Sequence, residues 1–426
     1  MSQPLINITR KQAFIFAAFL VFYEFLTYIA NDMIMPGMIQ VVKTLNGPES
    51  AVASSLTFYI LGGASLQLFL GPLSDYYGRR PVMLSGAALF LICTVFIASS
   101  QSMEQFLMAR FFQGMGLCFI GVVGYATLQE IFAEMDAIRL IAIMANVSIL
   151  APLLGPLLGA VFIHYFSWRL IFVFIGLGAL IALWGLYRHM PEPVGQMKTD
   201  GEEIKRVPLS PKVIAANYKN LLLNRAFLFG SIALGVLGLP CVAWIALAPV
   251  MLIADAKLSV IEYGLWQIPV FGAAILGNWF LQKLTKHYSS RMILFLGSMI
   301  VAVSLLLALL LPLLLANHFL WLMPGLIFYF FGLGITNAPL DRIILFSTPI
   351  AKGTASALMT LIAMFIQALG IEGMNVLYTS RQYTLFGLCC GLLALVYLML
   401  LGIAFLTVIR PGSGKSLKVL FGQQTP

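Results

Sequence analysis

Twelve long apolar runs dominate this sequence of 426 residues, and they restrict what the chain can fold into. A helix needs about 20 apolar residues to cross the hydrocarbon core of a bilayer. Because lipid offers the backbone no hydrogen-bond partners, only helices and closed barrels can span it. We therefore expect twelve transmembrane helices, at residues 13–36, 52–72, 81–100, 104–126, 138–164, 167–188, 225–253, 262–284, 291–313, 319–345, 353–377 and 383–409.

The composition agrees with an all-α polytopic membrane protein. Hydrophobic residues make up 61% of the chain, charged residues only 10%, and the mean hydropathy is +0.96. Soluble domains carry about a quarter charged residues. Arg10 and Lys11 precede an apolar run without a small-residue cleavage site, so we expect that run to remain as the first span. The five cysteines all fall in apolar runs and show no metal-ligand spacing, so no metal site is expected.

The basic residues predict the orientation of the chain. If both termini lie in the cytoplasm, 20 of the 25 lysines and arginines fall at the inner side. Lys43, Arg169, Lys257 and Arg381 fall at the outer side, and Arg110 lies inside a span. This bias follows the positive-inside rule, so we expect both termini to be cytoplasmic. A net charge of +9 could indicate a nucleic-acid partner. The basic residues are confined to short segments between the spans, and this distribution argues against such a partner.

One long polar stretch, residues 189–224, divides the spans into six plus six. We expect an N-terminal six-helix half at 1–188, a cytoplasmic linker at 189–224, a C-terminal six-helix half at 225–410 and a basic tail at 411–426. Two six-helix halves are a known plan for transporters.

The tail contains a sequence, GSGKS at Gly412–Ser416, that looks like part of a phosphate-binding loop. Such a loop needs another glycine five residues before the glycine of its Gly-Lys pair, and Ile409 stands there. We expect no nucleotide and no other cofactor, so any transport must draw its energy from an ion gradient.

The first span carries a polar stripe in the stretch FYEFLTYIANDMIMP. Glu24, Tyr28, Asn31 and Asp32 fall on one face of a helix. An acid at bilayer depth costs about 2.5 kcal/mol or more, so both acids should point into the bundle, toward a cavity. A carboxyl in a low-dielectric environment favours its neutral form and can release its proton when a cation arrives. The stripe predicts a proton-exchange site that also holds a positive substrate. The alternative is that each acid pairs with a buried base or caps a broken helix.

The string GPLSDYYGRRP follows the second span. Gly71 would allow close approach of the backbone, and Asp75 and Arg79 are four residues apart and can interact. Arg79 and Arg80 would anchor the chain at the inner leaflet. The alternative is ordinary positive-inside charge.

The string ARFFQGMG places Arg110 in the fourth span. A charge there is costly, so Arg110 needs an acid or carbonyl groups as partners. The alternative is an arginine that snorkels toward the outer interface.

The string APLLGPLLGA lies in the fifth span. Pro152 and Pro156 should kink or loosen this helix, and Gly155 and Gly159 form a GxxxG face for tight packing. The alternative is a generic helix contact.

Together these strings resemble the signatures of the major facilitator superfamily, namely G-x-L-x-D-x-x-G-R-[RK], R-x-x-Q-G-x-G and the G-P-x-x-G signature of antiporters. Ala160 stands where that last signature often has glycine. The first span resembles the first helix of the MdfA-type multidrug/proton antiporters, within the drug/proton antiporter branch. The similarity continues through Gly124–Glu130, Leu239–Pro249 and Tyr263–Ala273 and fades in the linker and the tail.

The resemblance implies the fold of that superfamily, with twelve helices in two six-helix pseudo-repeat halves. It also implies that Glu24 and Asp32 recognise protons and cationic drugs and that Arg110 is linked to proton transfer. The signature residues that it nominates are Gly71, Asp75, Gly78, Arg79, Arg80, Gln113, Gly114, Pro152, Gly155, Pro156 and Gly159.

We expect a proton-driven exporter of lipophilic, often cationic, drugs that works as a monomer in the bacterial inner membrane. Its apolar cavity would be lined by the acids and by Tyr28, Asn31, Tyr125, Trp244, Trp266 and Met251. One alternative is an exporter of a single endogenous compound such as a siderophore, a lipid or a metabolite. A membrane enzyme or a sensor is the other alternative, but no HExxH or GxSxG string is present.

Three further acids remain. We expect Asp341 to form a local ion pair with Arg342. Glu372 lies deep in the eleventh span without an obvious partner and is either a second proton site or a structural residue. Glu130 is expected at a gate or an interface and not in the pocket.

Overall fold

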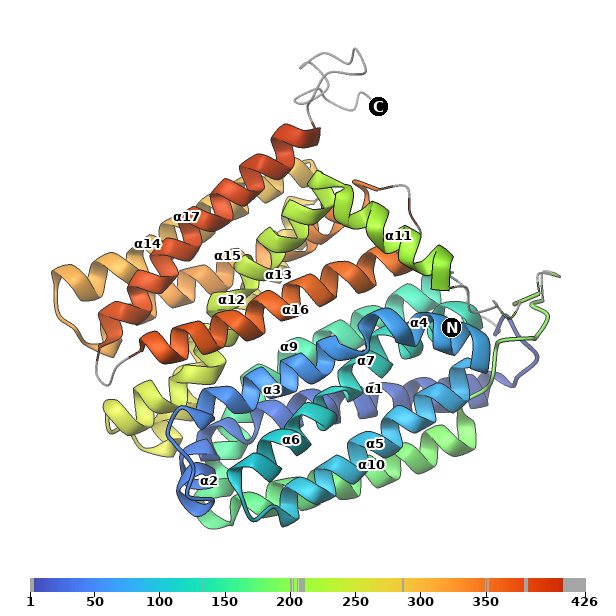
Figure 1. Cartoon of the computed structure of the whole chain (residues 1–426), viewed down its shortest axis with the longest axis horizontal. Coiled ribbons are helices and arrows are strands. Elements are labelled where there is room, and N and C mark those ends of the chain that lie inside the picture. Colours follow the sequence, from blue (N-terminus) through green and yellow to red (C-terminus); the bar gives the residue numbers. More distant parts are fainter. Residues whose placement is uncertain are drawn as a thin grey trace.

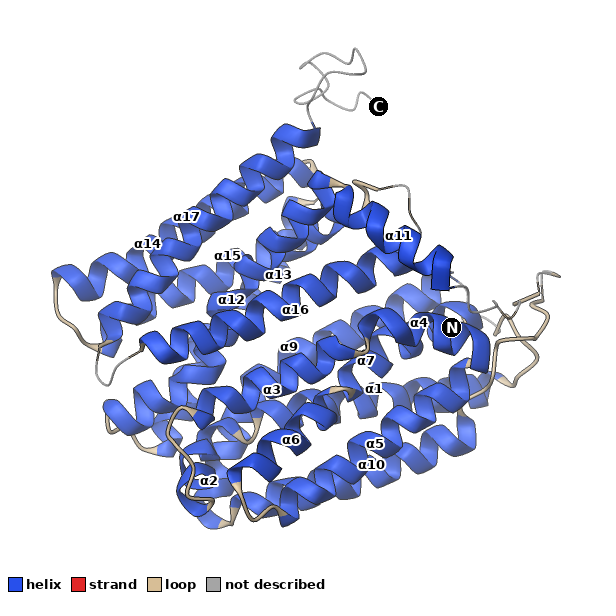
Figure 2. Cartoon of the chain, in the orientation of Figure 1, coloured by secondary structure: helices blue, strands red, loops and turns tan. Residues whose placement is uncertain are grey.

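The computed structural model describes residues 4–132, 134–199, 201, 203–204, 206, 211–285, 287–348, 350, 352–378 and 382–408. This part of the chain is almost entirely helical (Figure 2), and its only β-pairing is an isolated antiparallel bridge between Met197 and Glu203. The predicted basic tail at 411–426 lies outside the described residues.

The first half of the chain contains these helices: α1 (Arg10–Asp32), η1 (Met35–Gly37), α2 (Met38–Thr44), α3 (Ala51–Ser65), α4 (Gln67–Tyr77), α5 (Arg79–Ser99), α6 (Met103–Gly114), α7 (Gly116–Cys118), η2 (Phe119–Gly124), α8 (Tyr125–Ile131), α9 (Glu134–Tyr165) and α10 (Trp168–His189). The linker and the second half contain α11 (Pro211–Leu223), α12 (Arg225–Ala248), η3 (Pro249–Asp255), α13 (Val260–Leu284), α14 (Ser290–Leu314), α15 (Phe319–Leu345), α16 (Lys352–Leu377) and α17 (Tyr383–Val408).

These helices form the predicted twelve spans. Within the described ranges, ten helical stretches are long and apolar enough to cross a membrane, and α3 with α4 forms an eleventh span that bends by 42°. The twelfth is α9, whose 32 residues extend about 48 Å at 1.5 Å per residue. The chain is therefore a multi-pass membrane protein.

Two predicted boundaries are wrong because helices continue through irregular turns. The fourth span was expected to end at residue 126, but the π-helical turn η2 carries it through α8 to Ile131. The first span was expected to end at residue 36. Instead α1 ends at Asp32, a 3₁₀ turn takes in Pro36, and α2 continues to Thr44. A 3₁₀ turn accommodates a proline that has no N–H to donate.

The buried apolar side chains form two cores. Among the described residues, one gathers mainly residues of α1 to α10 and the other mainly residues of α11 to α17, so each half has its own core. Side chains of α3 also join the second core, among them Leu56 and Ile60. The halves meet mainly where α3 packs on α16 and α9 packs on α13, and α3 and α16 run side by side along this boundary (Figure 1).

The linker contains a helix that was not expected from its polarity. Helix α11 begins at Pro211, and Ile214, Tyr218 and Leu221 recur along one of its faces at helical spacing. Leu221 is fully buried in the core of the second half. The Tyr218 hydroxyl donates to the carbonyl oxygen of Leu68 in the first half at 3.2 Å. Helix α11 therefore lies across the ends of the bundle helices (Figure 1) and touches both halves.

Candidate functional site

The polar stripe of α1 lies inside the protein. Glu24 is 2% exposed, Asp32 is 3% exposed and Asn31 is 7% exposed, whereas Tyr28 is partly buried. The carboxyl groups therefore do not face lipid, and their burial agrees with the expectation that they point into the bundle.

Glu24 has a partner for one of its oxygen atoms only. The Tyr125 hydroxyl donates to Glu24 Oε1 at 3.0 Å, while Oε2 is buried with no hydrogen-bond partner among the described residues. Tyr125 is the first residue of α8 and directly follows the π-helical turn η2. Because a π-turn rotates the residues that follow it, η2 helps to set the direction in which Tyr125 points. Glu24 is left with unused acceptor capacity in a buried place.

Asp32 lies where the two halves of the protein meet. Its Oδ1 accepts a hydrogen bond from Asn31 Nδ2 at 3.1 Å. Its carboxyl group is also within electrostatic range of the Cys241 thiol on α12 and the Tyr263 phenol on α13. Both of these residues belong to the second half, so a change in the contact between the halves changes the surroundings of Asp32.

Arg110 is fully buried, so the alternative of a snorkelling arginine is wrong. Its Nη2 donates to Asn31 Oδ1, and its Nη1 donates to Gln113 Oε1 at 2.8 Å. The guanidinium lies over the ring of Tyr59 at 4.4 Å from the ring centre. Since Asn31 also donates to Asp32, its amide group links the base to the acid.

Neither acid of α1 is neutralised by a direct ion pair. Among the described residues, no lysine, arginine or histidine pairs with Glu24 or Asp32, whereas Arg79 forms ion pairs with Asp75 and Glu130. A buried carboxylate without a paired cation is costly, so each of these groups favours a proton or a cationic ligand.

The GxxxG face of α9 packs directly against the end of α1. A Cβ atom on Gly155 would lie 2.6 Å from Cβ of Asp32, and one on Gly159 would lie 1.9 Å from the carbonyl oxygen of Met33. Real Cβ contacts are not this short, so both positions require glycine for α9 to approach α1 this closely. Pro152 and Pro156 lie inside the same helix.

A second close crossing holds Arg110 next to Tyr59. A Cβ atom on Gly114 would lie 2.0 Å from the carbonyl oxygen of Tyr59, so α6 and α3 touch through their backbones at this point. Gln113, which precedes this glycine, donates to Thr94 Oγ1 at 2.8 Å while it accepts from Arg110. The signature R-x-x-Q-G-x-G thus folds into a crossing that orients the buried arginine.

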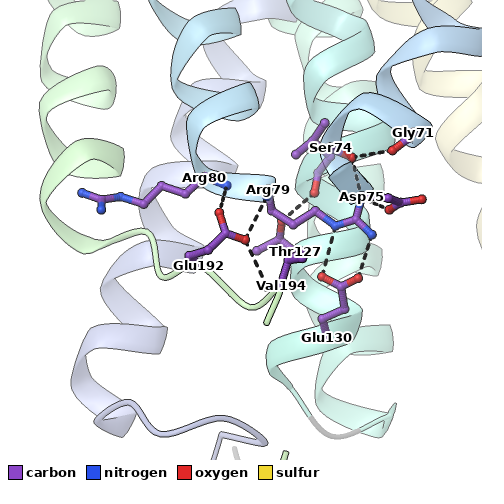
Figure 3. Close-up of polar contacts among 10 residues, drawn as sticks. Gly71, Ser74, Asp75, Arg79, Arg80, Thr127, Glu130, Glu192 and Val194 are labelled. Carbon is purple, nitrogen blue, oxygen red and sulfur yellow. Dashed lines mark hydrogen bonds and ion pairs between the residues drawn. The ribbon is translucent and has the colours of Figure 1, made fainter. Parts of the chain in front are cut away.

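The charged residues at the end of α4 and the start of α5 form a cluster around Arg79 (Figure 3). Arg79 Nη1 pairs with Asp75 Oδ1 at 2.6 Å, which confirms the predicted interaction, and also donates to the Ser74 hydroxyl. Arg79 Nη2 and Nε donate to the two oxygens of Glu130 at 2.7 and 3.1 Å. Glu130 therefore joins the end of α8 to the start of α5.

A glutamate from the linker caps α5 at the same place (Figure 3). Glu192 accepts from the backbone N–H groups of Arg79 and Arg80, each at 2.9 Å. Gly78 precedes them with a φ of +109°, and a Cβ atom there would lie 2.5 Å from Glu192 Oε2. Gly78 is thus needed both for its backbone conformation and for space. The expectation for Gly71 is wrong, because a Cβ atom there meets only an ordinary contact at 3.8 Å.

The three residues of the second half that are predicted to line the cavity lie in environments that differ from one another. Trp244 is fully buried, and its Nε1 donates to Gln267 Oε1 at 2.9 Å. Met251 is also fully buried. Trp266 packs against the ring of Phe319 and borders a surface pocket. No hydrogen bond or ring contact joins these three side chains to the acids of α1 within the described part of the chain.

Asp341 and Glu372, two further acids of the second half, have no ion-pair partner in the part of the chain that the structure describes. The predicted pair of Asp341 with Arg342 is wrong, because the Arg342 guanidinium lies over the Phe346 ring at 5.3 Å from its centre. Asp341 Oδ1 and Glu372 Oε1 are each buried without a hydrogen-bond partner there.

The sequence did not single out several residues that complete this site. Tyr59, Cys241 and Tyr263 approach it from α3, α12 and α13, and Glu192 reaches α5 from the linker. The i, i+4 spacing of Tyr263 and Gln267, whose side chain donates to the Tyr263 carbonyl oxygen at 3.2 Å, is a polar pattern in the sequence that could have indicated an inward face of α13. Nothing in the spacing indicates which helices of the second half face α1.

The twelve spans in two halves, with buried acids at the boundary of the halves, define a class of secondary transporters that move solutes between two membrane-embedded domains. The family profile of the Major Facilitator Superfamily matches residues 20–371. The chain belongs to this superfamily.

Two groups of known proteins are similar to this chain. The multidrug transporter MdfA of Yersinia pestis is 46% identical over 392 residues, which cover 91% of this chain and 94% of that protein. MdfA of Escherichia coli O6:H1 is 45% identical over 85% of this chain and 86% of its own length. Among solved structures, a bacterial homologue of the human lysosomal transporter Spinster superposes with a TM-score of 0.69 at 14% identity, over 94% and 98% of the two chains. The xylose transporter XylE of E. coli superposes with a TM-score of 0.66 at 15% identity, over 96% and 100%.

Proposed function

We propose that this protein exports lipophilic, often cationic, drugs across the bacterial inner membrane in exchange for protons. It works as a monomer by alternating access, with both termini in the cytoplasm. The relatives named multidrug transporter support the substrate class, and the lysines and arginines concentrated on one side of the spans support the orientation.

The observation that carries this proposal is the pair of buried carboxyl groups on α1 that lack ion-pair partners. Glu24 and Asp32 fall on one helix face, and each has unused acceptor capacity. Such a group is stable when it holds a proton or when a cation lies beside it, but not when it is charged and alone. Protonation and binding of a cationic drug therefore oppose each other, which is the coupling that exchange needs.

The exchange cycle follows from the place of Asp32 at the boundary between the halves. A proton that enters from outside neutralises Asp32 or Glu24, the drug loses its counter-charge, and it leaves. The halves then rock against each other and expose the site to the other side. The membrane potential adds about 2.3 kcal/mol per charge per 100 mV to a net inward movement of charge.

Proton-driven transport in membrane vesicles tests the proposal. Asp32→Asn should abolish export of cationic drugs, because the amide neither loses a proton nor attracts a cation. Glu24→Gln should reduce export of cations and spare neutral drugs. Glu49→Gln alters an exposed acid and is the matched control. Unchanged cation export in Asp32→Asn, in Glu24→Gln and in the double variant would rule out the proposed site.

A panel of cationic, neutral and anionic compounds tests the substrate class in the same vesicles. Broad export of unrelated cations is the expected result. Export of one compound only would favour the alternative of a transporter for a single endogenous compound.

A further inference from the structure

Helix α12 contains a weak turn in its middle. Pro240 lies inside the helix, has no N–H to donate and clashes with the carbonyl group four residues before it. Gly235 and Gly238 precede it and lower the helix propensity further. The segment GVLGLPC therefore needs contacts with other helices to keep a single backbone conformation.

A tyrosine from another helix supplies this support. Tyr329 of α15 is fully buried, and its hydroxyl donates to the carbonyl oxygen of Leu237 at 2.6 Å. The hydroxyl oxygen of Tyr329 in turn accepts a hydrogen bond from the backbone N–H of Cys241 at 3.2 Å. Leu237 and Cys241 are four residues apart, so these are the two groups that pair directly in an unbroken helix. The hydroxyl thus joins both ends of the turn that contains Pro240.

The other side of this turn faces the first half. Cys241 is only partly buried, and its thiol is within electrostatic range of the Asp32 carboxyl group. The side of Gly238 is closed by α16, since a Cβ atom there would lie 2.4 Å from Gln367 Nε2. The turn is therefore held by α15 and α16, and its conformation fixes the surface that α12 presents to the first half.

We propose that Tyr329 is a positioning residue of the transport site. Its hydroxyl holds the Pro240 turn of α12 in a single conformation, and it thereby sets the surface that α12 presents to the first half and the fit of a cationic drug between the halves. This inference rests on the proposed function only for its link to transport. The placement of Cys241 can be measured without transport.

The first test compares Tyr329→Phe with Tyr397→Phe in proton-driven vesicle transport. Tyr397 is a matched control, because its buried hydroxyl forms a hydrogen bond with the Ser298 side chain of α14 at 2.7 Å and not with the backbone of α12. Tyr329→Phe should raise KM for a cationic drug about fivefold, the scale of one hydrogen bond, with a smaller effect on kcat. Tyr397→Phe should leave KM unchanged. Equal KM values for the two variants would contradict the link to drug fit.

The second test measures how fast a membrane-permeant maleimide labels Cys241 in the full chain. Cys93, Cys118, Cys389 and Cys390 are replaced by alanine so that Cys241 is the single thiol. Tyr329→Phe should change the labelling rate about fivefold and Tyr397→Phe should not. If this rate and KM are both the same in the two variants, the positioning role is overturned. A changed labelling rate in a chain that moves no drug supports the placement and counts against the proposed function alone.

Discussion

At the scale of single residues, Asn31 links the two charged groups at the centre of the site. Its side-chain amide accepts from Arg110 and donates to Asp32, so one residue satisfies a buried base and a buried acid at once. Removal of that amide leaves two buried polar groups short of a partner. The loss of such a partner costs about 1–3 kcal/mol, and more when the groups are charged.

We therefore predict that Asn31→Ala lowers drug export in vesicles at least about tenfold, which corresponds to 1.4 kcal/mol. Asn220→Ala is the control, because Asn220 is an exposed residue of α11. The measurement is the initial rate of export at fixed proton gradient. A rate for Asn31→Ala equal to that of Asn220→Ala would show that the amide link between Arg110 and Asp32 does not matter for transport.

The stripe itself was predictable, since the spacing of Glu24, Asn31 and Asp32 places them on one face of any helix, and lipid then forces that face inward. The partners of these residues were not. Tyr125 reaches Glu24 after a π-helical turn, which no apolar pattern indicates. Cys241 and Tyr263 approach Asp32 from helices that lie more than 200 residues later in the chain.

At the scale of elements, the contact between α9 and α1 ties the antiporter signature to the acid. Gly155 leaves room for Asp32, and a methyl group there would overlap the Asp32 side chain. Overpacking of a close contact costs about 1–3 kcal/mol through shifts of the backbone or side chains. The shift would fall on the acid that we propose to carry protons and drugs.

Gly155→Ala should therefore reduce export strongly and lower the melting temperature of the purified protein. Gly402→Ala on α17 is a matched control, because a Cβ atom there meets nothing within 4 Å. Both substitutions raise helix propensity by about 1 kcal/mol, so propensity alone predicts higher stability for both. If Gly155→Ala were as stable and as active as Gly402→Ala, close packing of α9 on Asp32 would not be a requirement of the site.

The pattern of apolar residues predicts the spans, but it does not predict every other element of the fold. The twelve spans follow from composition and length, because the bilayer imposes both. Helix α11 was missed, since its apolar face is narrow and a window average reads the segment as polar. The cap on α5 was missed for a different reason: Glu192 and Arg79 are 113 residues apart, and only the packing of α10 beside α5 brings them together.

At the scale of the whole molecule, alternating access requires the two halves to move as bodies. Each half has its own buried core, which allows it to keep its shape while the contacts between the halves change. One contact that crosses between them is the hydrogen bond from Asn375 Nδ2 on α16 to the carbonyl oxygen of Ser50, the residue before α3, at 3.0 Å. Both residues lie near the ends of their helices, where rotation of one half against the other gives the largest displacement.

A covalent link at this place should stop transport. We predict that the pair Ser50→Cys with Asn375→Cys, joined by a short bismaleimide, loses export while each single variant keeps it. The pair Asn317→Cys with Thr384→Cys is the control, because these side chains bond each other at 2.8 Å within the second half. A link there does not join the halves and should leave export intact. Continued export from the fully linked Ser50–Asn375 pair would mean that the two halves do not separate at this end during the cycle, and rocking of the halves would then have to be replaced by a local motion around Asp32.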